Sequence, residues 1–398
     1  MASIFTTKPV LWIRAFFEFL TTILIRFPIW VILALPRSNR PRPTWSIGRT
    51  VIIRVLQRLG SSSLGAVRTL IKSPDYRSLE QGKGVRGVWV PAVPHLIVGE
   101  VKKWAEEANV ESVNIPAYWL ERKGANLLPN ARPLEGEKIL FVLHGGAYAM
   151  QSAHPKDTAA HIPHGILDFS GASVNRAFML EYRNSKSPAQ PPSNPFPAAL
   201  LDAIAGYNYL INEIGFAAEN IVVEGDSAGG NLALALTRYL LQNKETDGIP
   251  PPPGGLILIS PWTDLRPDPA NRTSSFFANA DSDFILDLVA EDGPAVMNFL
   301  GPHGKEAAVT NPYISPASLA PTMPPVSFEG YPRTLIISGM TEIFLDQIRV
   351  LYDRMKVNMG SKVRYMEFAD VWHDFVLFPN LEPQRTEALN VIGGWIEE

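Results

Sequence analysis

The stretch that best indicates the fold is residues 222–230, Val222-Val223-Glu224-Gly225-Asp226-Ser227-Ala228-Gly229-Gly230. It contains the pattern Gly-x-Ser-x-Gly. A β-branched run precedes the pattern and an Ala/Leu-rich stretch follows it, so we expect a strand at 221–224 and a helix at 228–243. The serine would then occupy a sharp strand-to-helix turn, where small residues on both sides let the two segments approach closely. The positive end of the helix favours negative charge at this point. Ser227 is therefore the candidate nucleophile.

A second glycine-rich turn follows an apolar strand predicted at 138–143. It reads Leu143-His144-Gly145-Gly146-Ala147-Tyr148. By itself such a turn is equally well explained as a plain connection between a strand and a helix. With the serine motif later in the chain, it predicts an oxyanion hole, in which backbone N–H groups stabilise a developing alkoxide.

A nucleophilic serine needs a base and an acid that orients the base. Among seven histidines, His373 follows the last predicted strand, at 363–368, and precedes a C-terminal helix. The acid should follow the preceding strand, at 334–338, where Glu342 comes first and Asp346 falls on the next helix. We choose Glu342, which gives the order serine, acid, histidine along the chain.

The composition excludes several other functions. Disulfides and cysteine-based catalysis or metal sites are impossible because the chain has no cysteine. A net charge of −3 gives no reason to expect a nucleic-acid partner. His154, His161 and His164 lie close together, but with Pro163 between the last two and no acidic partner at helical spacing they read as solvated loop histidines. We expect no metal and no cofactor.

Strands alternate with helices from residue 85 onward, which predicts a mostly parallel sheet flanked by helices. Of the 398 residues, 46% are hydrophobic and 19% charged, an ordinary globular composition with enough apolar material for a large core. The predicted strands lie at 85–91, 138–143, 177–182, 221–224, 256–260, 334–338 and 363–368, and the predicted helices include 198–213 and 228–243.

The N-terminus is unusually apolar between residues 10 and 35, a run long enough to cross a bilayer. It contains Arg14, Glu18 and Arg26, of which the first two are four residues apart and could pair in a helix. Three interpretations stay open: a single-pass anchor, which we favour, an amphipathic helix in the membrane interface, and a buried cap helix. A cleaved signal peptide fits less well, because the run is too long and lacks a clear cleavage site.

The first 84 residues divide at a basic, proline-rich linker at 37–46. Residues 1–36 would form the membrane segment, and residues 37–84 the linker and cap helices. Helical spacing at 47–72 and again at 95–109 predicts a lid. The expected location is a membrane, for example that of the endoplasmic reticulum, with the cytosol as the alternative; arginines on both sides leave the orientation undecided. The oligomeric state is not predicted.

Taken together, these motifs resemble the hormone-sensitive-lipase-like branch of the α/β hydrolases. The two principal matches are the His144-Gly145-Gly146 turn and the stretch from Gly225 to Gly230. The resemblance covers residues 85–398 and implies an α/β-hydrolase fold. It also implies a helical cap built from the N-terminal segment and an insertion at about 265–310.

By the same match, the oxyanion donors are the N–H groups of Gly146, Ala147 and Ala228. Two residues depart from the usual pattern of the family. Ala147 stands where a third glycine is common, which keeps the N–H but adds a methyl beside the acyl site. Glu342 stands where bacterial relatives commonly carry aspartate, and a glutamate serves equally well.

The resemblance implies a serine carboxylic-ester hydrolase that works through an acyl-enzyme. The apolar N-terminus makes the chain similar to fungal membrane-anchored steryl acetyl hydrolases, so the expected substrate is a small lipophilic ester, such as an acetylated sterol or secondary metabolite. Two alternatives use the same fold: an acyltransferase with the same residues, and a small-molecule receptor without catalysis.

Overall fold

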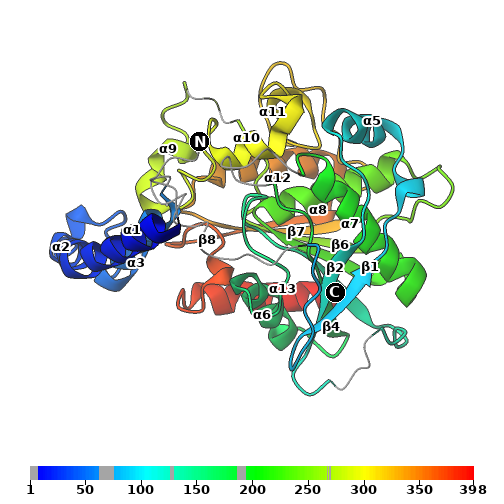
Figure 1. Ribbon diagram of the computed structural model, residues 1–398, viewed down its shortest axis with the longest axis horizontal. Helices are drawn as coiled ribbons and strands as arrows, with labels where there is room; N and C mark the ends of the chain where they lie inside the picture. Colours follow the sequence, from blue (N-terminus) through cyan, green and yellow to red (C-terminus); the bar gives the residue numbers. More distant parts are fainter. Residues whose placement is uncertain (1–7, 62–75, 126–129, 186–193, 267, 269) are drawn as a thin grey trace.

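The computed structural model describes residues 8–61, 76–125, 130–185, 194–266, 268 and 270–398. Within them lies an eight-stranded sheet in the order β1-β2-β4-β3-β5-β6-β7-β8 (Figure 1). The six strands from β4 to β8 in this order run parallel, and β2 is antiparallel to both of its neighbours. The strands are β1 Arg86–Val90, β2 Ile115–Glu121, β3 Lys138–Leu143, β4 Val174–Leu180, β5 Ile221–Asp226, β6 Gly255–Ile259, β7 Arg333–Gly339 and β8 Val363–Phe368.

Helices cover both faces of the sheet, as Figure 1 shows. One face is packed by α7 (Ala198–Asn208), α8 (Ala228–Gln242) and α12 (Leu345–Met359), whose apolar residues belong to one core cluster. The other is packed by α6 (His161–Phe169) and α13 (Gln384–Glu397), which belong to a second cluster. Every residue of β5 and β6 is buried, as expected for parallel strands covered on both sides. The predicted α/β-hydrolase fold is confirmed.

Strand β2 is the one element of the sheet that the sequence did not predict. Its sequence Ile-Pro-Ala-Tyr-Trp-Leu-Glu lacks the alternation of a half-buried strand, because all but its last residue are buried. Pro116 also argues against a strand, since proline cannot donate to the ladder. It is tolerated here as the second residue of the strand, where its carbonyl accepts a hydrogen bond from Glu181 N at 3.0 Å.

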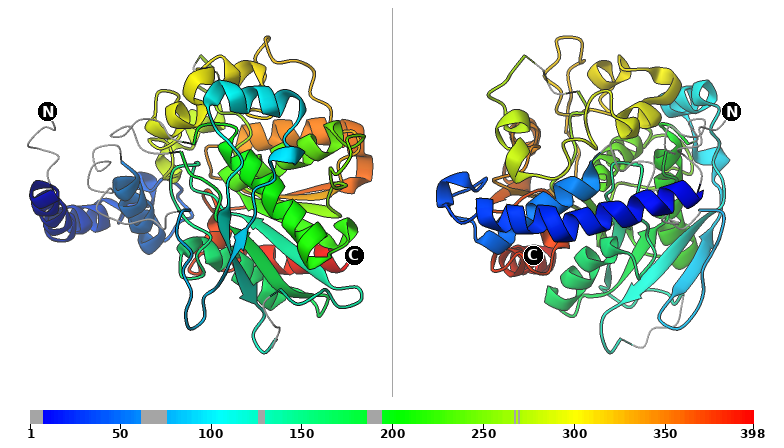
Figure 2. Two further views of the ribbon diagram at one scale, coloured as in Figure 1. Left: turned by 45° about the vertical axis from the view of Figure 1, so that its right-hand side comes forward. Right: turned by 60° about the vertical axis from the view of Figure 1, so that its left-hand side comes forward.

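The N-terminal residues form a long helical rod made of α1 (Lys8–Thr21), a π-helical turn (Thr22–Arg26) and α2 (Phe27–Leu33). The span Pro9–Leu33 is long and apolar enough to cross a membrane. The chain then reverses, and α3 (Ile47–Gly60) begins at Ser46, whose hydroxyl accepts from Arg49 N at 3.1 Å. The predicted helix at 47–72 therefore ends at Gly60 in the described part, and its remainder lies outside the described residues. In the left view of Figure 2, α3 lies between the rod and the body that contains the sheet, and in the right view the rod crosses in front of that body.

The region predicted as an insertion contains only short elements. Its helices are α9 (Ser275–Ala278), α10 (Pro294–Leu300) and α11 (Ala307–Thr310), and a loop at 283–293 separates the first two. The predicted helix at 95–109 corresponds to α5 (Gly99–Ala108), which ends at Asn109 in the left-handed region. The 3-10 turns are Arg37–Asn39, Pro94–Leu96, Thr158–Ala160, Ala218–Asn220, Ala280–Ser282, Gly301–His303, Gly360–Lys362 and Phe375–Leu377, and a second π-helical turn is Tyr209–Ile214.

Candidate active site

Ser227 lies between the end of β5 and the start of α8, in a strained backbone conformation with φ 50° and ψ −114°. Two backbone hydrogen bonds hold Ser227 in this conformation and make the strain tolerable. Ser227 N donates to Ile259 O at 2.9 Å, and Trp262 N donates to Ser227 O at 2.9 Å. A Cβ on Gly225 would lie 2.3 Å from Gly229 O. A Cβ on Gly229 would lie 1.7 Å from the Leu143 carbonyl oxygen. Both glycines are therefore required by close backbone approach.

The structure brings His373 and Glu342 to this serine. His373 Nε2 lies 2.9 Å from Ser227 Oγ, and its Nδ1 lies 3.1 Å from Glu342 Oε2. The other oxygen of Glu342 accepts from Gly339 N at 2.9 Å, which holds the carboxylate at the end of β7. All three side chains are buried, and they come from the loops after β5, β7 and β8. The sequence placed each of them at the end of its strand, where the structure has them.

Burial and charge act in opposite directions on these groups. Burial favours the neutral form of His373, but the Asp374, Glu342 and Asp283 carboxylates outweigh it and raise the pKa of the imidazole well above its ordinary value. Burial raises the pKa of Glu342 to about 7, against the opposing hydrogen bond from His373. The surrounding carboxylates therefore favour the imidazolium form of His373, and burial opposes the charged form of Glu342.

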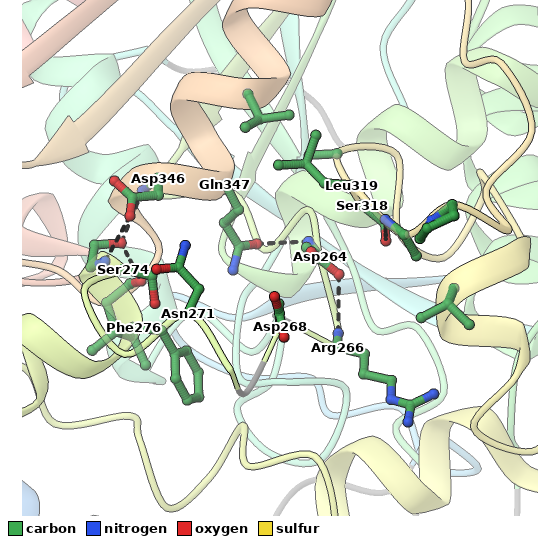
Figure 3. A pocket seen from close by; sticks show the side chains of 17 residues that line it. Asp264, Arg266, Asp268, Asn271, Ser274, Phe276, Ser318, Leu319, Asp346 and Gln347 are labelled. Atoms are coloured by element: carbon green, nitrogen blue, oxygen red, sulfur yellow. Dashed lines mark hydrogen bonds between the residues drawn. The ribbon is translucent and has the colours of Figure 1, made fainter.

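The alternative acid, Asp346, lies elsewhere. Its Oδ2 accepts a hydrogen bond from Ser275 N at 2.7 Å. Figure 3 shows it at the rim of a separate cavity of about 500 Å³, together with Asp264, Asn271 and Gln347. Ser227 and His373 do not line that cavity.

The glycine-rich turn after β3 lies next to the serine. Gly146, Ala147 and Tyr148 all have positive φ, at 98°, 54° and 56°, so the backbone turns sharply at these residues. Gly146 O is occupied by the N–H groups of Ala149 and Met150, each at 3.0 Å. Gly146 and Ala147 line the same cavity as Ser227, whereas Ala228, the third expected donor, follows Ser227 as the first residue of α8.

His144 and Gly145 support this turn from beneath. The His144 ring stacks on Tyr182 with centroids 4.2 Å apart, and its Nδ1 lies 2.8 Å from Gly145 O. Tyr182 donates to the His144 carbonyl at 2.6 Å. Burial lowers the pKa of His144 to about 4, so the ring is neutral at pH 7. Its place is structural, since it does not line the cavity that holds Ser227.

The cavity at Ser227 has a volume of about 310 Å³ and is mainly apolar. Leu56 of α3 forms part of its wall, so the N-terminal region contributes directly to the site. The loop at 283–293 contributes a second apolar wall. The full lining is Leu56, Gly146, Ala147, Met150, Gln151, Thr158, His161, Ser227, Phe284, Ile285, Leu288, Val289, His373, Asp374, Leu377, Phe378 and Pro379.

Two acidic residues near His373 were missed by the sequence reasoning. Asp374 Oδ2 lies 3.0 Å from His373 Nε2. Asp283 accepts from Phe284 N and Ile343 N, each at 2.7 Å, and burial raises its pKa to about 6. Asp374 is adjacent to the predicted base, and this adjacency was the available signal. No local sequence pattern marks Asp283, which belongs to the predicted insertion and is brought close to His373 by the fold.

Two further carboxyl groups are buried beneath the serine. Both oxygens of Glu224 and one oxygen of Asp226 have no hydrogen-bond partner among the described residues. Burial raises the pKa values of both groups well above their ordinary range, and the Asp374 carboxylate adds to the shift in each case. The charge of Asp226 also raises the pKa of Glu224.

The prediction that the three clustered histidines are solvated loop residues is only partly right. His154 is buried, with its ring against Tyr118 and Nε2 3.2 Å from Glu80. His161 and His164 are exposed but begin α6, because Pro163 falls in the first helical turn, where proline is tolerated. Among the described residues, no cluster suited to a metal ion is present.

The chain belongs to the alpha/beta hydrolase fold family, which matches residues 140–377. It is 29% identical over 262 residues to an acetyl-hydrolase from Streptomyces hygroscopicus, covering 66% of this chain and 76% of that protein. It is 26% identical over 159 residues to steryl acetyl hydrolase 1 from Saccharomyces cerevisiae, covering 39% of this chain and 32% of the yeast protein. With an esterase from Acinetobacter venetianus it shares 26% identity over 252 residues, 63% of this chain and 72% of that one.

Solved structures show the same fold. A hormone-sensitive lipase from a metagenome library matches with a TM-score of 0.57 and 24% identity, over 88% of this chain and 98% of the other. An esterase/lipase from an uncultured bacterium matches with a TM-score of 0.56 and 23% identity, over 94% and 97%. The resemblance to the hormone-sensitive-lipase-like branch is confirmed, and the protein is an enzyme of the ester-hydrolase class.

Proposed function

We propose that Ser227 is the nucleophile of a serine ester hydrolase, with His373 as its base and Glu342 as the acid that orients the base. The observation that carries this proposal is the continuous chain of contacts from Ser227 Oγ to His373 Nε2, at 2.9 Å, and from His373 Nδ1 to Glu342, at 3.1 Å. This is the geometry that a base needs for abstracting the proton of a serine hydroxyl.

In the proposed reaction, Ser227 Oγ attacks the ester carbonyl while His373 Nε2 accepts its proton. Glu342 accepts the hydrogen bond from Nδ1–H and stabilises the imidazolium that forms. The N–H groups of Gly146, Ala147 and Ala228 stabilise the tetrahedral oxyanion. The imidazolium then protonates the leaving alcohol, and an acyl-enzyme remains. Water, deprotonated by His373, releases the acid and restores the serine.

For the substrate we propose an acetate ester of a lipophilic alcohol, such as a sterol or a secondary metabolite. The methyl of Ala147 narrows the acyl side of the site beside Gly146, which favours a short acyl group. The apolar cavity of about 310 Å³ provides room for a lipophilic alcohol. The similarity to acetyl-hydrolases supports the same substrate class. Residues 10–35 are proposed to hold the enzyme at a membrane.

A fluorophosphonate probe tests the nucleophile. Wild type should be labelled and Ser227→Ala should not, whereas the surface variant Ser173→Ala should be labelled like wild type. Labelling of Ser227→Ala at the wild-type level would reject the assignment.

A series of esters tests the substrate. Acetate esters, including a sterol acetate, should be hydrolysed faster than butyrate or decanoate esters of the same alcohol. Ala147→Gly should raise the relative rate on butyrate, because the methyl is removed. Faster hydrolysis of long-chain esters by the wild type would overturn the proposed acyl specificity and leave the nucleophile assignment intact.

A further inference from the structure

The helical rod at Pro9–Leu33 presents large apolar side chains to solvent over most of its circumference. Trp12, Phe16, Phe17 and Phe19 are 59–62% exposed, and Leu24 is 68% exposed. Soluble proteins rarely expose an apolar surface of this extent unless it binds another surface. The rod therefore has an apolar partner beyond the described residues.

A narrow polar stripe interrupts this apolar surface, and it faces the protein. Glu18 Oε1 accepts from Arg26 Nη1 at 2.7 Å, and Arg26 Nη1 also donates to the hydroxyls of Thr21 and Thr22, each at 3.0 Å. Glu18 also forms an ion pair with Arg58 of α3. Glu18 therefore meets Arg26 of the rod and Arg58 of α3 on the same side.

Helix α3 is itself fixed to the catalytic body. Ile53 is fully buried, and Gln57 Nε2 donates to the carbonyls of Ala280, Asp281 and Asp283 at 3.2, 3.1 and 2.8 Å. Arg58 follows Gln57 directly, so its ion pair holds the middle of the rod against the body. Figure 2 agrees, because its left view shows α3 between the rod and the rest of the molecule.

This placement is incompatible with a rod that crosses the bilayer. The midpoint of a spanning helix lies at the centre of a hydrocarbon layer about 30 Å thick. Glu18 is near that midpoint, so spanning would draw Arg58, Gln57 and the loop at 280–283 into the hydrocarbon. Charged groups at that depth are costly. A rod lying parallel to the membrane surface keeps the same contacts without this cost.

The charge of the adjoining segment also suits a membrane surface. From residue 37 to residue 58 the chain has no acidic residue, and besides Arg58, which pairs with Glu18, it carries five arginines, Arg37, Arg40, Arg42, Arg49 and Arg54. Basic segments next to an apolar helix attract anionic lipid headgroups. Leu56, between Arg54 and Arg58, lines the cavity that contains Ser227.

We propose that the rod lies in the plane of one leaflet of an anionic bilayer, and that the cavity at Ser227 takes its ester from that leaflet across α3. The inference rests on the proposed membrane association of the enzyme. It replaces the single-pass anchor favoured by the sequence with an in-plane helix that is docked on the catalytic body.

The absence of cysteine allows a clean test of topology in the full-length chain. Ser3→Cys and Glu245→Cys would be inserted separately into sealed microsomes and treated with an impermeant maleimide. An in-plane rod predicts that both cysteines are labelled together or protected together. A spanning rod predicts that one is labelled and the other protected, and that result overturns the proposal.

A cross-link in the membrane tests the docking. The pair Glu18→Cys and Arg58→Cys should be joined by a short bis-maleimide cross-linker, whose length replaces that of the two side chains that meet in the ion pair. The control pair, Phe16→Cys and Arg58→Cys, should not, because Phe16 lies on the opposite side of the rod. Equal yields from both pairs, or none from the first, would contradict the docked arrangement.

Two further measurements, vesicle flotation and ester turnover, distinguish a failure of the in-plane arrangement from a failure of membrane association or of the proposed role of Ser227. The protein should float with phosphatidylcholine vesicles that contain phosphatidylserine, and recovery should fall when phosphatidylserine is omitted. Failure to float would overturn the membrane association and this inference together. Hydrolysis of a water-soluble acetate ester in detergent reports on Ser227 alone, whatever the topology of the rod.

Discussion

Nε2 of His373 lies 3.0 Å from Asp374 Oδ2, at almost the same distance as from Ser227 Oγ. At this distance the Asp374 carboxylate favours the protonated imidazole, and Asp374 is the first of the charges that raise the pKa of His373. A protonated Nε2 cannot accept the proton of Ser227. Activity therefore requires that Nε2 loses its proton first.

The first prediction concerns the pH dependence of this step. Asp374, Glu342, Asp283 and Asp226 face His373, and Asp374 is the first of the carboxylates that raise its pKa against burial. Asp374→Asn removes that charge and lowers the pKa of His373. The acidic limb of kcat/KM should therefore move to lower pH, measured on a soluble acetate ester. The distant surface variant Asp247→Asn should leave the profile in place. An unmoved acidic limb in Asp374→Asn would show that Asp374 does not raise the pKa of His373.

A second prediction concerns Glu342. Glu342→Gln keeps the shape of the side chain but removes the charge that orients and stabilises the imidazolium. The expected loss in kcat is on the order of 10³–10⁴-fold, with little change in KM. Glu342→Asp should recover part of the activity. Steady-state kinetics measures both variants, and a loss below about tenfold in Glu342→Gln would remove Glu342 from the proposed mechanism.

The third prediction concerns the close approach beneath the serine. Gly229→Ala places a methyl 1.7 Å from the Leu143 carbonyl oxygen, so β3 and α8 must move apart. The free energy of unfolding should fall by more than about 4 kcal/mol, measured by urea denaturation. Gly394→Ala is the matched control, because Gly394 is an exposed residue of α13 and no atom lies within 4 Å of its added methyl. It should be more stable by about 0.5–1 kcal/mol. Equal stability of the two variants would refute the steric argument.

A fourth prediction tests whether α3 shapes the substrate cavity. Leu56→Trp enlarges a side chain that lines the cavity at Ser227. The value of kcat/KM for acetates of bulky alcohols should fall about tenfold or more, while that for a small acetate changes little. Leu59→Trp is the control on the same helix, because Leu59 is 57% exposed and does not line the cavity. A parallel loss on small and bulky acetates would count against a role for α3 in selection.

The sequence predicted most of the sheet and the residues that meet at Ser227 because local constraints are strict there. A serine at a sharp turn needs glycines around it, and parallel strands buried on both faces read as apolar runs. Strand β2 was missed because its burial removes the expected alternation and it contains Pro116. Asp283 and Leu56 reach the site from segments far away in the chain, and no local pattern carries that information.

The rod shows a different limit of the sequence. Its length and apolar content favour a spanning helix but are also compatible with an interfacial or a buried helix. The contact between Glu18 and Arg58, 40 residues apart, places its midpoint on the catalytic body. A pattern of hydrophobicity indicates which surfaces avoid water. The orientation of the helix relative to the membrane depends on a tertiary contact, which the pattern does not contain.

Glu224 and Asp226, the buried acids beneath the serine, make the stability of the fold depend on pH independently of catalysis. Each has a raised pKa in the folded state, so folding takes up protons from solution once the pH exceeds the unfolded values. Stability is fully present below those values and decreases as the pH rises toward the folded pKa values. Activity changes in the opposite sense, because His373 must lose its proton. Activity thus falls toward the acid side as the base becomes protonated, whereas stability falls toward the alkaline side.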